Sequence, residues 1–301
     1  MPAIGKTRQP SKLPKRKAPQ AEEVFDPEVG RARGVLMPPP AEGRMRHARR
    51  RPPDDLANWI EHFWSVSWSL DRGETFLQET LPHPNVHIVF EPDRSGIAGV
   101  HTARFSRILE GESRVFGIKF RAGGFRPFLG SSVSTLANRI VPLEQVFGND
   151  AVQWQATMLA SPDETTQITA ASSFLREHLP APDPSVTLAS QLVDQILQTS
   201  NGGDGIQTVG IRTVEELARR NSIGQRSLQR LFQEYVGASP KWVIRRYRLH
   251  ELVERLKAGD VVDGAQAALD LGYFDQAHLI NDFRSIVGYS PSTYGNLLRH
   301  V

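Results

Sequence analysis

The sequence predicts an α+β protein, with a β-rich N-terminal domain (a sheet or a partial barrel) that also carries helices, followed by an all-α C-terminal domain. Three observations support this prediction. Between about residues 59 and 121, apolar and polar residues alternate as they do in strands. From about residue 143 the apolar spacing becomes helical. Near the end of the chain two similar segments lie 51 residues apart, FQEYVGASPKWV at 232–243 and FRSIVGYSPSTY at 283–294. They share Phe, Val, Gly, Ser and Pro at matching positions.

Composition limits the classes of protein that the chain can represent. A length of 301 residues allows two domains, and 39% hydrophobic with 23% charged residues is ordinary for a globular protein. The chain has no cysteine, which excludes disulfides, thiolate metal sites and cysteine nucleophiles. We find no apolar run of the ~18 residues that a membrane span needs, and no apolar core of a secretory signal. The expected location is therefore the cytoplasm.

Charge is distributed unevenly along the chain. Residues 1–51 hold 13 Lys and Arg against 5 Asp and Glu, residues 52–210 hold 10 against 18, and residues 211–301 hold 13 against 10. The two ends therefore suit a polyanionic partner better than the acidic middle does. Residues 1–52 are also rich in Pro and show no helical or strand period, which predicts a disordered basic tail. Its KLPKRK stretch fits a nucleic-acid contact or, as charge runs more often do, a solvated tail.

Residues 53–180 are expected to form a domain that binds an effector or dimerises. The segments HFWSVSWSL, NVHIVFEP and RVFGIKF alternate with period two, and they predict a small antiparallel sheet or partial barrel. Helical spacing follows at about 143–160 and 163–179. The stretch PAPDPS at 180–185 marks the boundary, and one more helix is expected at 186–199.

Two features of this domain allow either a structural or a functional interpretation. Its aromatic residues could line an effector pocket, although core packing is the commoner role for such a set: Trp64, Trp68, Phe116 and Phe120. His83 and His87 are spaced to share one face of a strand, as two metal ligands would be. No third ligand has a convincing spacing, so we predict no metal and no cofactor.

The first repeat, at about 213–236, predicts two short helices joined by a tight turn. Thr213 followed by Glu216 has the pattern of a capping box, and a break follows at 221–224. In the next helix the apolar residues recur at i, i+3, i+4 and i+7. The opposite face of that helix carries Gln225, Arg226, Gln229, Arg230 and Gln233. This pattern predicts a helix-turn-helix motif.

The second repeat, at about 264–287, has the same order of features. Asp275 is placed to cap its second helix, whose outward residues include Gln276, Ala277, His278 and Asn281. Its turn is one residue longer than that of the first repeat. Between the repeats, Ser239 and Pro240 begin a helix of about 18 residues, ~27 Å long. Such a rod can hold two recognition helices about one DNA turn apart, ~34 Å, which predicts binding to successive major grooves.

Residues 187–300 resemble the AraC/XylS family of bacterial transcription regulators, in LQRLF, GASPKW, RRYRL, ALDLGYFDQAHL and GYSPSTY. The resemblance implies an AraC/XylS-type DNA-binding domain at 186–301 and promoter DNA as the partner. It implies base-reading roles for one set of residues: Gln225, Arg226, Gln229, Arg230, Gln276, Ala277, His278 and Asn281. It implies phosphate contacts for a second set: Ser239, Lys241 and Arg245. The chemistry agrees, since Arg suits guanine and Gln suits adenine.

This chain departs from the family pattern at three positions. Gly224 stands where the family usually has Ser, Asn281 where it often has Arg, and Ile280 where the first repeat has Gln229. We therefore expect weaker base reading by the second repeat. A small-molecule effector is expected because the mouth of a β-barrel forms a concave apolar pocket. RNA polymerase and a second copy of the chain are further candidate partners.

Two other function classes compete with this interpretation. An enzyme fused to a DNA-binding domain is disfavoured, because no P-loop, G-x-S-x-G or H-E-x-x-H motif is present and an alkyl-transfer repair protein would need a cysteine. The second class is an architectural DNA-binding protein whose N-terminal domain only dimerises. Effector identity, target promoter and the choice between activation and repression are not encoded in these patterns.

Overall fold

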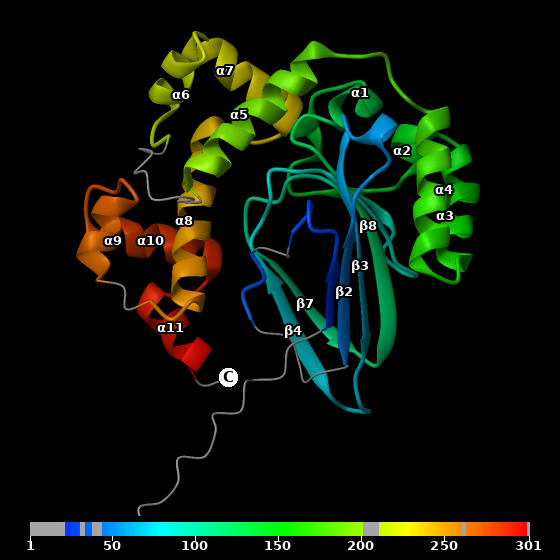
Figure 1. Ribbon diagram of the computed structural model, residues 1–301, viewed down its shortest axis with the longest axis horizontal. Coiled ribbons are helices and arrows are strands. Elements are labelled where there is room, and N and C mark those ends of the chain that lie inside the picture. Colours follow the sequence, from blue (N-terminus) through cyan, green and yellow to red (C-terminus); the bar gives the residue numbers. More distant parts are fainter. Residues whose placement is uncertain (1–21, 31–33, 38–43, 201–210, 261–262, 300–301) are drawn as a thin grey trace, which may run out of the picture.

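The computed structural model describes residues 22–30, 34–37, 44–200, 211–260 and 263–299 (Figure 1). These residues form two lobes that lie side by side. One lobe is a sheet with helices α2, α3 and α4 packed along one side of it, and the other is the helical lobe α5–α11. The sheet lobe followed by the helical lobe is the α+β arrangement that the sequence predicts.

The main sheet has seven strands in the order β1-β2-β3-β8-β5-β6-β9, and every neighbouring pair except β1 and β2 is antiparallel. Its long central pair is β3 with β8, in which Trp64 lies opposite Gly117. Two further strands, β4 and β7, form a separate antiparallel ribbon. The strands are β1 Glu22–Phe25, β2 Met45–Arg50, β3 Ile60–Ser69, β4 Thr75–Thr80, β5 His87–Phe90, β6 Gly96–Ala98, β7 Phe105–Glu110, β8 Glu112–Phe120 and β9 Ile140–Val141.

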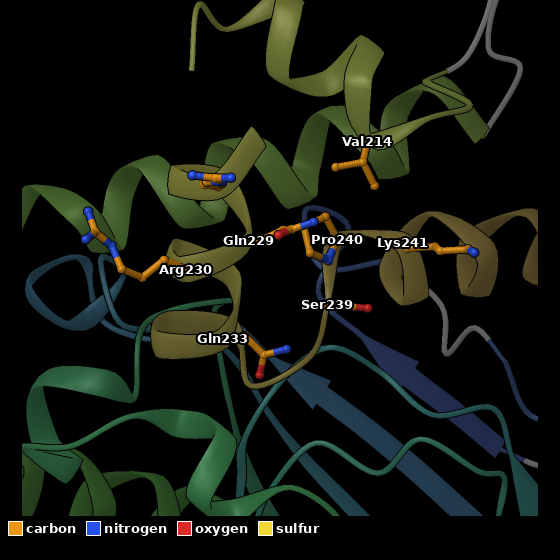
Figure 2. Close-up of a pocket in the computed structure, with 8 residues that line it drawn as sticks. Val214, Gln229, Arg230, Gln233, Ser239, Pro240 and Lys241 are labelled. Atoms are coloured by element: carbon orange, nitrogen blue, oxygen red, sulfur yellow. The ribbon is translucent and has the colours of Figure 1, made fainter. Parts of the chain in front are cut away.

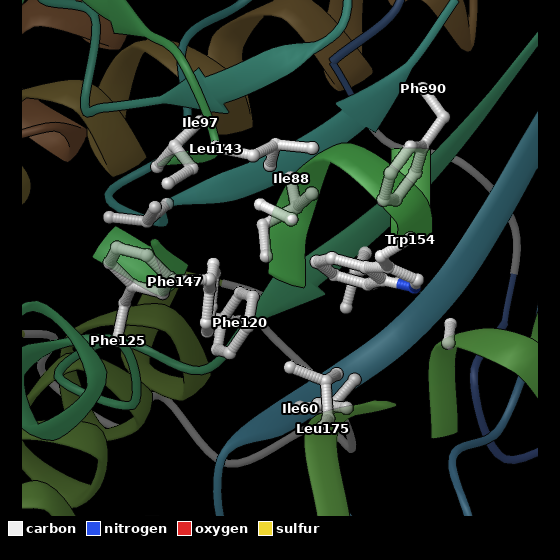
Figure 3. Close-up of a cluster of buried hydrophobic side chains, with 14 of the residues drawn as sticks. Ile60, Ile88, Phe90, Ile97, Phe120, Phe125, Leu143, Phe147, Trp154 and Leu175 are labelled. Carbon is white, nitrogen blue, oxygen red and sulfur yellow. The ribbon is translucent and has the colours of Figure 1, made fainter. Parts of the chain in front are cut away.

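The largest core lies between this sheet and the helices that cover it (Figure 3). Trp154 of α3 stacks on Phe174 of α4 with ring centroids 3.9 Å apart, and Phe90 meets Trp154 edge-on at 4.9 Å. The helices are α1 Arg126–Leu129, α2 Glu144–Phe147, α3 Asp150–Ala160 and α4 Glu164–Glu177, with 3-10 turns η1 Asp54–Leu56 and η2 Val133–Leu136. The two helical stretches predicted at 143–160 and 163–179 are therefore confirmed, with a break at Gly148 in the first.

Core packing is the role of the aromatic residues for which we considered a pocket. Phe116 and Phe120 are fully buried in the main core, and Trp68 is buried in a smaller cluster under the β4–β7 ribbon. Trp64 packs at the edge of that smaller cluster and donates from Nε1 to His87 Nδ1 (3.2 Å).

The prediction of a disordered tail over residues 1–52 is wrong for two segments. Strand β2 pairs along its whole length with residues 63–68 of β3, and β1 adds to β2. Residues 1–21 lie outside the described residues. The strand MRHARR shows no alternation of period two, because its arginines stand on both faces and its buried residues, Met45 and Ala48, are three apart. Acidic partners of these arginines are distant in sequence. One such arginine is Arg50, whose Nε lies 2.6 Å from Glu164 of α4.

The helical lobe begins with the long helix α5, which the sequence places at 186–199. The remaining helices follow the predicted repeat, and the lobe packs around the rod α8. The helices are α5 Pro184–Ser200, α6 Val214–Arg220, α7 Gln225–Leu231 continued by the π turn η3 Phe232–Val236, α8 Pro240–Lys257, α9 Gly264–Asp270, α10 Gln276–Val287 and α11 Pro291–Arg299.

The sheet lobe contributes side chains to the cores of both helix-turn-helix units. Val100 and Ala122 are buried in the cluster that contains α6 and α7, and Leu36 and Leu81 are buried in the cluster that contains α9 and α10. The hydroxyl of Tyr294 on α11 donates to the backbone carbonyl of Leu36 (2.5 Å). The helical lobe is therefore completed by residues far upstream in the chain.

Candidate nucleic-acid interface

The first helix-turn-helix unit is held by a cap on α6 and an apolar contact between its helices. Thr213 Oγ1 accepts from the amide of Glu216 (3.0 Å), and Glu216 Oε2 accepts from the amide of Arg212 (3.0 Å). The capping box is thus present, although its return bond reaches the amide one residue before Thr213. Leu217 of α6 and Leu228 of α7 are fully buried against each other's helices in one cluster.

The outward face of α7 presents the side chains that the sequence predicts. Gln225, Arg226, Gln229 and Arg230 are all exposed, and they lie along one helix. The residues that line a surface pocket beside α7 are Val214, Arg226, Gln229, Arg230, Gln233, Ser239, Pro240 and Lys241 (Figure 2). Gln233 belongs to η3, which continues α7. The described residues provide no acidic ion-pair partner for Arg226, Arg230 or Lys241. The face is therefore open and positively charged.

The second unit is built in the same way. Asp263 Oδ1 accepts from the amide of Ala265 (2.9 Å), and Asp275 Oδ1 accepts from the amide of His278 (2.7 Å), so a carboxylate caps each helix. Leu279 and Phe283 of α10 are buried in the core. The predicted reading residues on the outer side are all exposed: Gln276, Ala277, His278 and Asn281.

The structure shows which residue makes the second turn longer. In the first unit the amide of Ile223 donates to the carbonyl of Ala218 (2.9 Å), and in the second the amide of Tyr273 donates to the carbonyl of Ala268 (2.8 Å). Ile223 and Tyr273 are thus equivalent, 50 residues apart. The helix caps Gly224 and Asp275 are 51 residues apart. Gly224 directly follows Ile223, whereas one residue, Phe274, stands between Tyr273 and Asp275 and makes the second turn longer.

The rod between the units is α8, and its 18 residues match the predicted length. Ser239 Oγ accepts from the amide of Trp242 (3.2 Å), so Ser239 caps the helix from within the surface that also holds Lys241. The N-terminal half of α8 packs into the core of the first unit and the C-terminal half into that of the second. The buried residues of the two halves are Val243, Ile244 and Tyr247, then Leu249, Leu252 and Val253.

The arginines of the rod bind other residues of the protein. Arg245, expected at a DNA phosphate, is half-buried, with Nε 2.7 Å from Asp282 and Nη2 donating to Ser285 Oγ (2.6 Å). Arg255 Nη1 lies 3.6 Å from Asp270 Oδ2 and forms an ion pair with it.

Arg246 is buried against the sheet lobe without an acidic partner among the described residues. Its Nε donates to the carbonyl of Pro82, and its Nη2 lies 3.2 Å from His83 Nδ1. Burial lowers the pKa of its guanidinium to about 10, which still leaves it charged at neutral pH. Sequence spacing does not distinguish Arg246 from its half-buried neighbours Arg245 and Arg248, because the loop that covers Arg246 comes from another lobe.

Comparison with known proteins adds to this geometry. Residues 217–296 match a family of helix-turn-helix domains, and residues 48–142 match a domain of unknown function, DUF6597. The doubled motif, the rod and the match to residues 217–296 decide what this domain is. Residues 217–296 form an AraC-type helix-turn-helix domain. No curated protein matches the chain over its sequence.

Two solved structures illustrate the similarity in fold. ToxT from Vibrio cholerae O395 is 12% identical, with a TM-score of 0.37 over 79% of this chain and 99% of that chain. The C-terminal domain of AraT, a response regulator from Geobacillus stearothermophilus, is 21% identical, with a TM-score of 0.30 over 38% of this chain and 85% of that chain. These TM-scores are low, and the assignment of the helix-turn-helix domain rests on the family match and the repeat.

In the described part of the chain, His83 and His87 belong to no group of three or more possible metal ligands. His87 accepts from Trp64, and His83 lies against Arg246. Burial lowers the pKa of His87 to about 3, with Lys119 adding to the effect, so its imidazole is neutral.

Among the described helices, none is long and apolar enough to cross a membrane.

Two exposed residues beside the predicted site received no role from the sequence. Gln233, which the sequence placed on the outward face of its helix, lines the same pocket as Arg230. Phe274 is 91% exposed in the turn before α10. The extra residue in that turn was visible in the sequence, but its exposure was not, because aromatic residues in a turn more often fold inward.

Proposed function

We propose that this regulator reads one face of a DNA duplex by placing α7 and α10 in successive major grooves. The observation that carries the proposal is the pair of exposed recognition faces held at the two ends of α8. A helix of 18 residues is ~27 Å long, which is comparable to the ~34 Å between successive major grooves on one face.

In this proposal, the first unit makes most of the hydrogen bonds to bases. Arg226 and Arg230 suit the O6 and N7 atoms of guanine, while Gln225 and Gln229 suit the N6 and N7 atoms of adenine. The second unit offers Gln276, His278 and Asn281, but Ala277 and Ile280 stand where the first has Arg226 and Gln229. Phosphate contacts are proposed for Ser239, Lys241 and Arg245, the last after it leaves Asp282.

Footprinting of the full-length protein on DNA upstream of its own and adjacent genes tests the proposal. We expect two protected half-sites one helical turn apart, and binding that weakens with salt at a log–log slope of about −0.9 per phosphate neutralised. Random-sequence duplex of equal length is the control. Equal affinity for random and genomic DNA, or the absence of binding to both, contradicts sequence-specific regulation.

We further propose that a small molecule bound to the sheet lobe controls this binding. Support comes from the packing of that lobe into both helix-turn-helix cores. Because of this packing, a ligand that shifts the sheet lobe would also shift α7 and α10. Isothermal titration of candidate metabolites, followed by DNA binding with and without each ligand, separates this from the architectural alternative. A protein that binds its operator identically whatever metabolite is added, and that only dimerises through the sheet lobe, fits the alternative.

A further inference from the structure

Phe274 has an unusual environment for a large apolar side chain. It is 91% exposed, more than any other large hydrophobic residue in the described part of the chain. Its neighbours hold the turn without it. On one side Tyr273 is buried in the core of the second unit, and on the other Asp275 caps α10. Phe274 is therefore not needed to fix the local fold.

Comparison of the two repeats shows that Phe274 is an addition. Ile223 and Tyr273 occupy the same place and pack inward, and the caps Gly224 and Asp275 follow. Phe274 has no counterpart in the first unit. The second unit thus carries one extra aromatic side chain in the turn that leads into its recognition helix.

That turn adjoins the proposed reading face. Gln276, Ala277 and His278 form the exposed first turn of α10, directly after the Asp275 cap. In helix-turn-helix proteins the N-terminal residues of the recognition helix are those that contact base edges in the major groove. A side chain that projects from the position before the cap is therefore next to the residues expected to enter the groove.

The chemistry of the second unit favours an apolar contact. At the positions of Arg226 and Gln229 it has Ala277 and Ile280, which form no hydrogen bonds to bases. The C5-methyl group of thymine is the apolar feature of the major groove, and Phe is a side chain that contacts it. We propose that Phe274 contacts a thymine methyl group in the half-site bound by α10 and so sets a base preference there. This inference rests on the proposed DNA binding.

The test combines a protein variant with a change of a single methyl group in DNA. Full-length wild type and Phe274→Ala are titrated against the footprinted operator, in which each thymine of the second half-site is replaced in turn by deoxyuridine. We expect Phe274→Ala to weaken binding about ten-fold, or about 1.4 kcal/mol. One deoxyuridine should weaken wild-type binding by a similar factor and leave Phe274→Ala binding unchanged, because both changes remove the same contact.

The matched control is Leu269→Ala, which removes another exposed apolar side chain, on α9, and should bind the operator as wild type does. Unchanged binding by Phe274→Ala overturns the inference. So does a loss that no deoxyuridine reproduces, which would indicate a contact with the sugar-phosphate backbone. A variant that binds normally but loses transcription in a reporter assay also overturns it, in favour of a protein partner.

Failure of the inference is distinguishable from failure of the proposed function. Arg230→Ala, in the first unit, is titrated against the same operator. If Arg230→Ala loses affinity and Phe274→Ala does not, DNA reading by the first unit stands and only the role of Phe274 is wrong. If neither variant changes binding, the proposed interface itself is wrong.

Discussion

Arg104 of the sheet lobe donates from Nη1 to the backbone carbonyl of Val287 (2.9 Å), the last residue of α10. The equivalent point of the first unit is the Val236-Gly237 turn, where a Cβ added to Gly237 would lie 2.8 Å from Val133 of η2. Ser132, next to Val133, donates to the carbonyl of Gln233 (3.0 Å). The sheet lobe therefore contacts the same turn of both repeats, at the C-terminal end of each recognition helix.

Replacing Arg104 should destabilise the protein and loosen the second unit. Its guanidinium is also the nearest cation to Glu79, at 3.2 Å, and Glu79 is only 1% exposed. Arg104→Ala leaves that carboxylate without the ion pair, and we expect a loss of about 1–3 kcal/mol in the free energy of unfolding. Urea unfolding measures it. Arg94→Ala, a change at an exposed arginine, is the control, and equal stabilities of the two variants contradict the assignment.

The two recognition helices should contribute unequally to base reading. Arg230→Ala should cost about 1–3 kcal/mol of binding and relax the preference at one base position. Ala277→Gly, at a position with no hydrogen-bonding side chain, should lose only the helix propensity of Ala, up to ~1 kcal/mol. Binding to a panel of single-base-pair substitutions across both half-sites provides the measurement. Greater intolerance to substitution in the half-site of α10 reverses the assignment.

Truncation at the N-terminus should have two outcomes that depend on where the cut lies. Residues 1–21 hold six Lys and Arg and no acidic residue, so their removal should lower non-specific affinity and leave the footprint in place. Removal of residues 1–50 also deletes β1 and β2 and exposes the edge of β3, so the sheet should lose stability. Footprinting and thermal unfolding of both truncations test this. A footprint that shifts on removal of residues 1–21 shows that the tail reads bases.

The isolated fragment 185–301 should bind DNA but unfold more easily than the helical lobe of the intact chain. Both recognition helices and α8 lie in the fragment. It loses Leu36 and Leu81 from its core, and the Tyr294 hydroxyl loses its acceptor. Mobility-shift assays and urea unfolding measure the two properties. Stability equal to that of the full chain would show that the interlobe contacts contribute nothing.

Stability should fall as the pH drops from about 6.5 towards 4. Burial lowers the pKa of His62 to about 4 and that of His87 to about 3, so both stay neutral in the folded protein while the unfolded chain binds protons below about 6.5. Each histidine should remove roughly 1–2 kcal/mol between pH 6.5 and 5. Urea unfolding across this range should show a smaller slope for His87→Gln, and a slope equal to that of wild type contradicts the prediction.

The sequence alone determined the helical lobe, the helix caps at Thr213 and Asp275, and the length of α8. These features depend on local patterns of apolar spacing and capping, which act over a few residues. It also determined the exposed positions of Arg226 and Arg230, since the buried face of α7 leaves them only the opposite side. The order of strands did not follow from it, because strand pairing joins residues far apart in the chain.

Tertiary structure alone decided three further points. It placed MRHARR in the sheet, because the partners of its arginines, such as Glu164, come from a distant helix. It buried Arg246 under the Pro82 loop while leaving Arg226 exposed, although both are arginines on helices with similar patterns. It directed Phe274 outward, because Tyr273 and Asp275 already fill the inward and capping positions of that turn. For MRHARR and Arg246 the deciding contact comes from a residue distant in the chain, which local spacing does not encode.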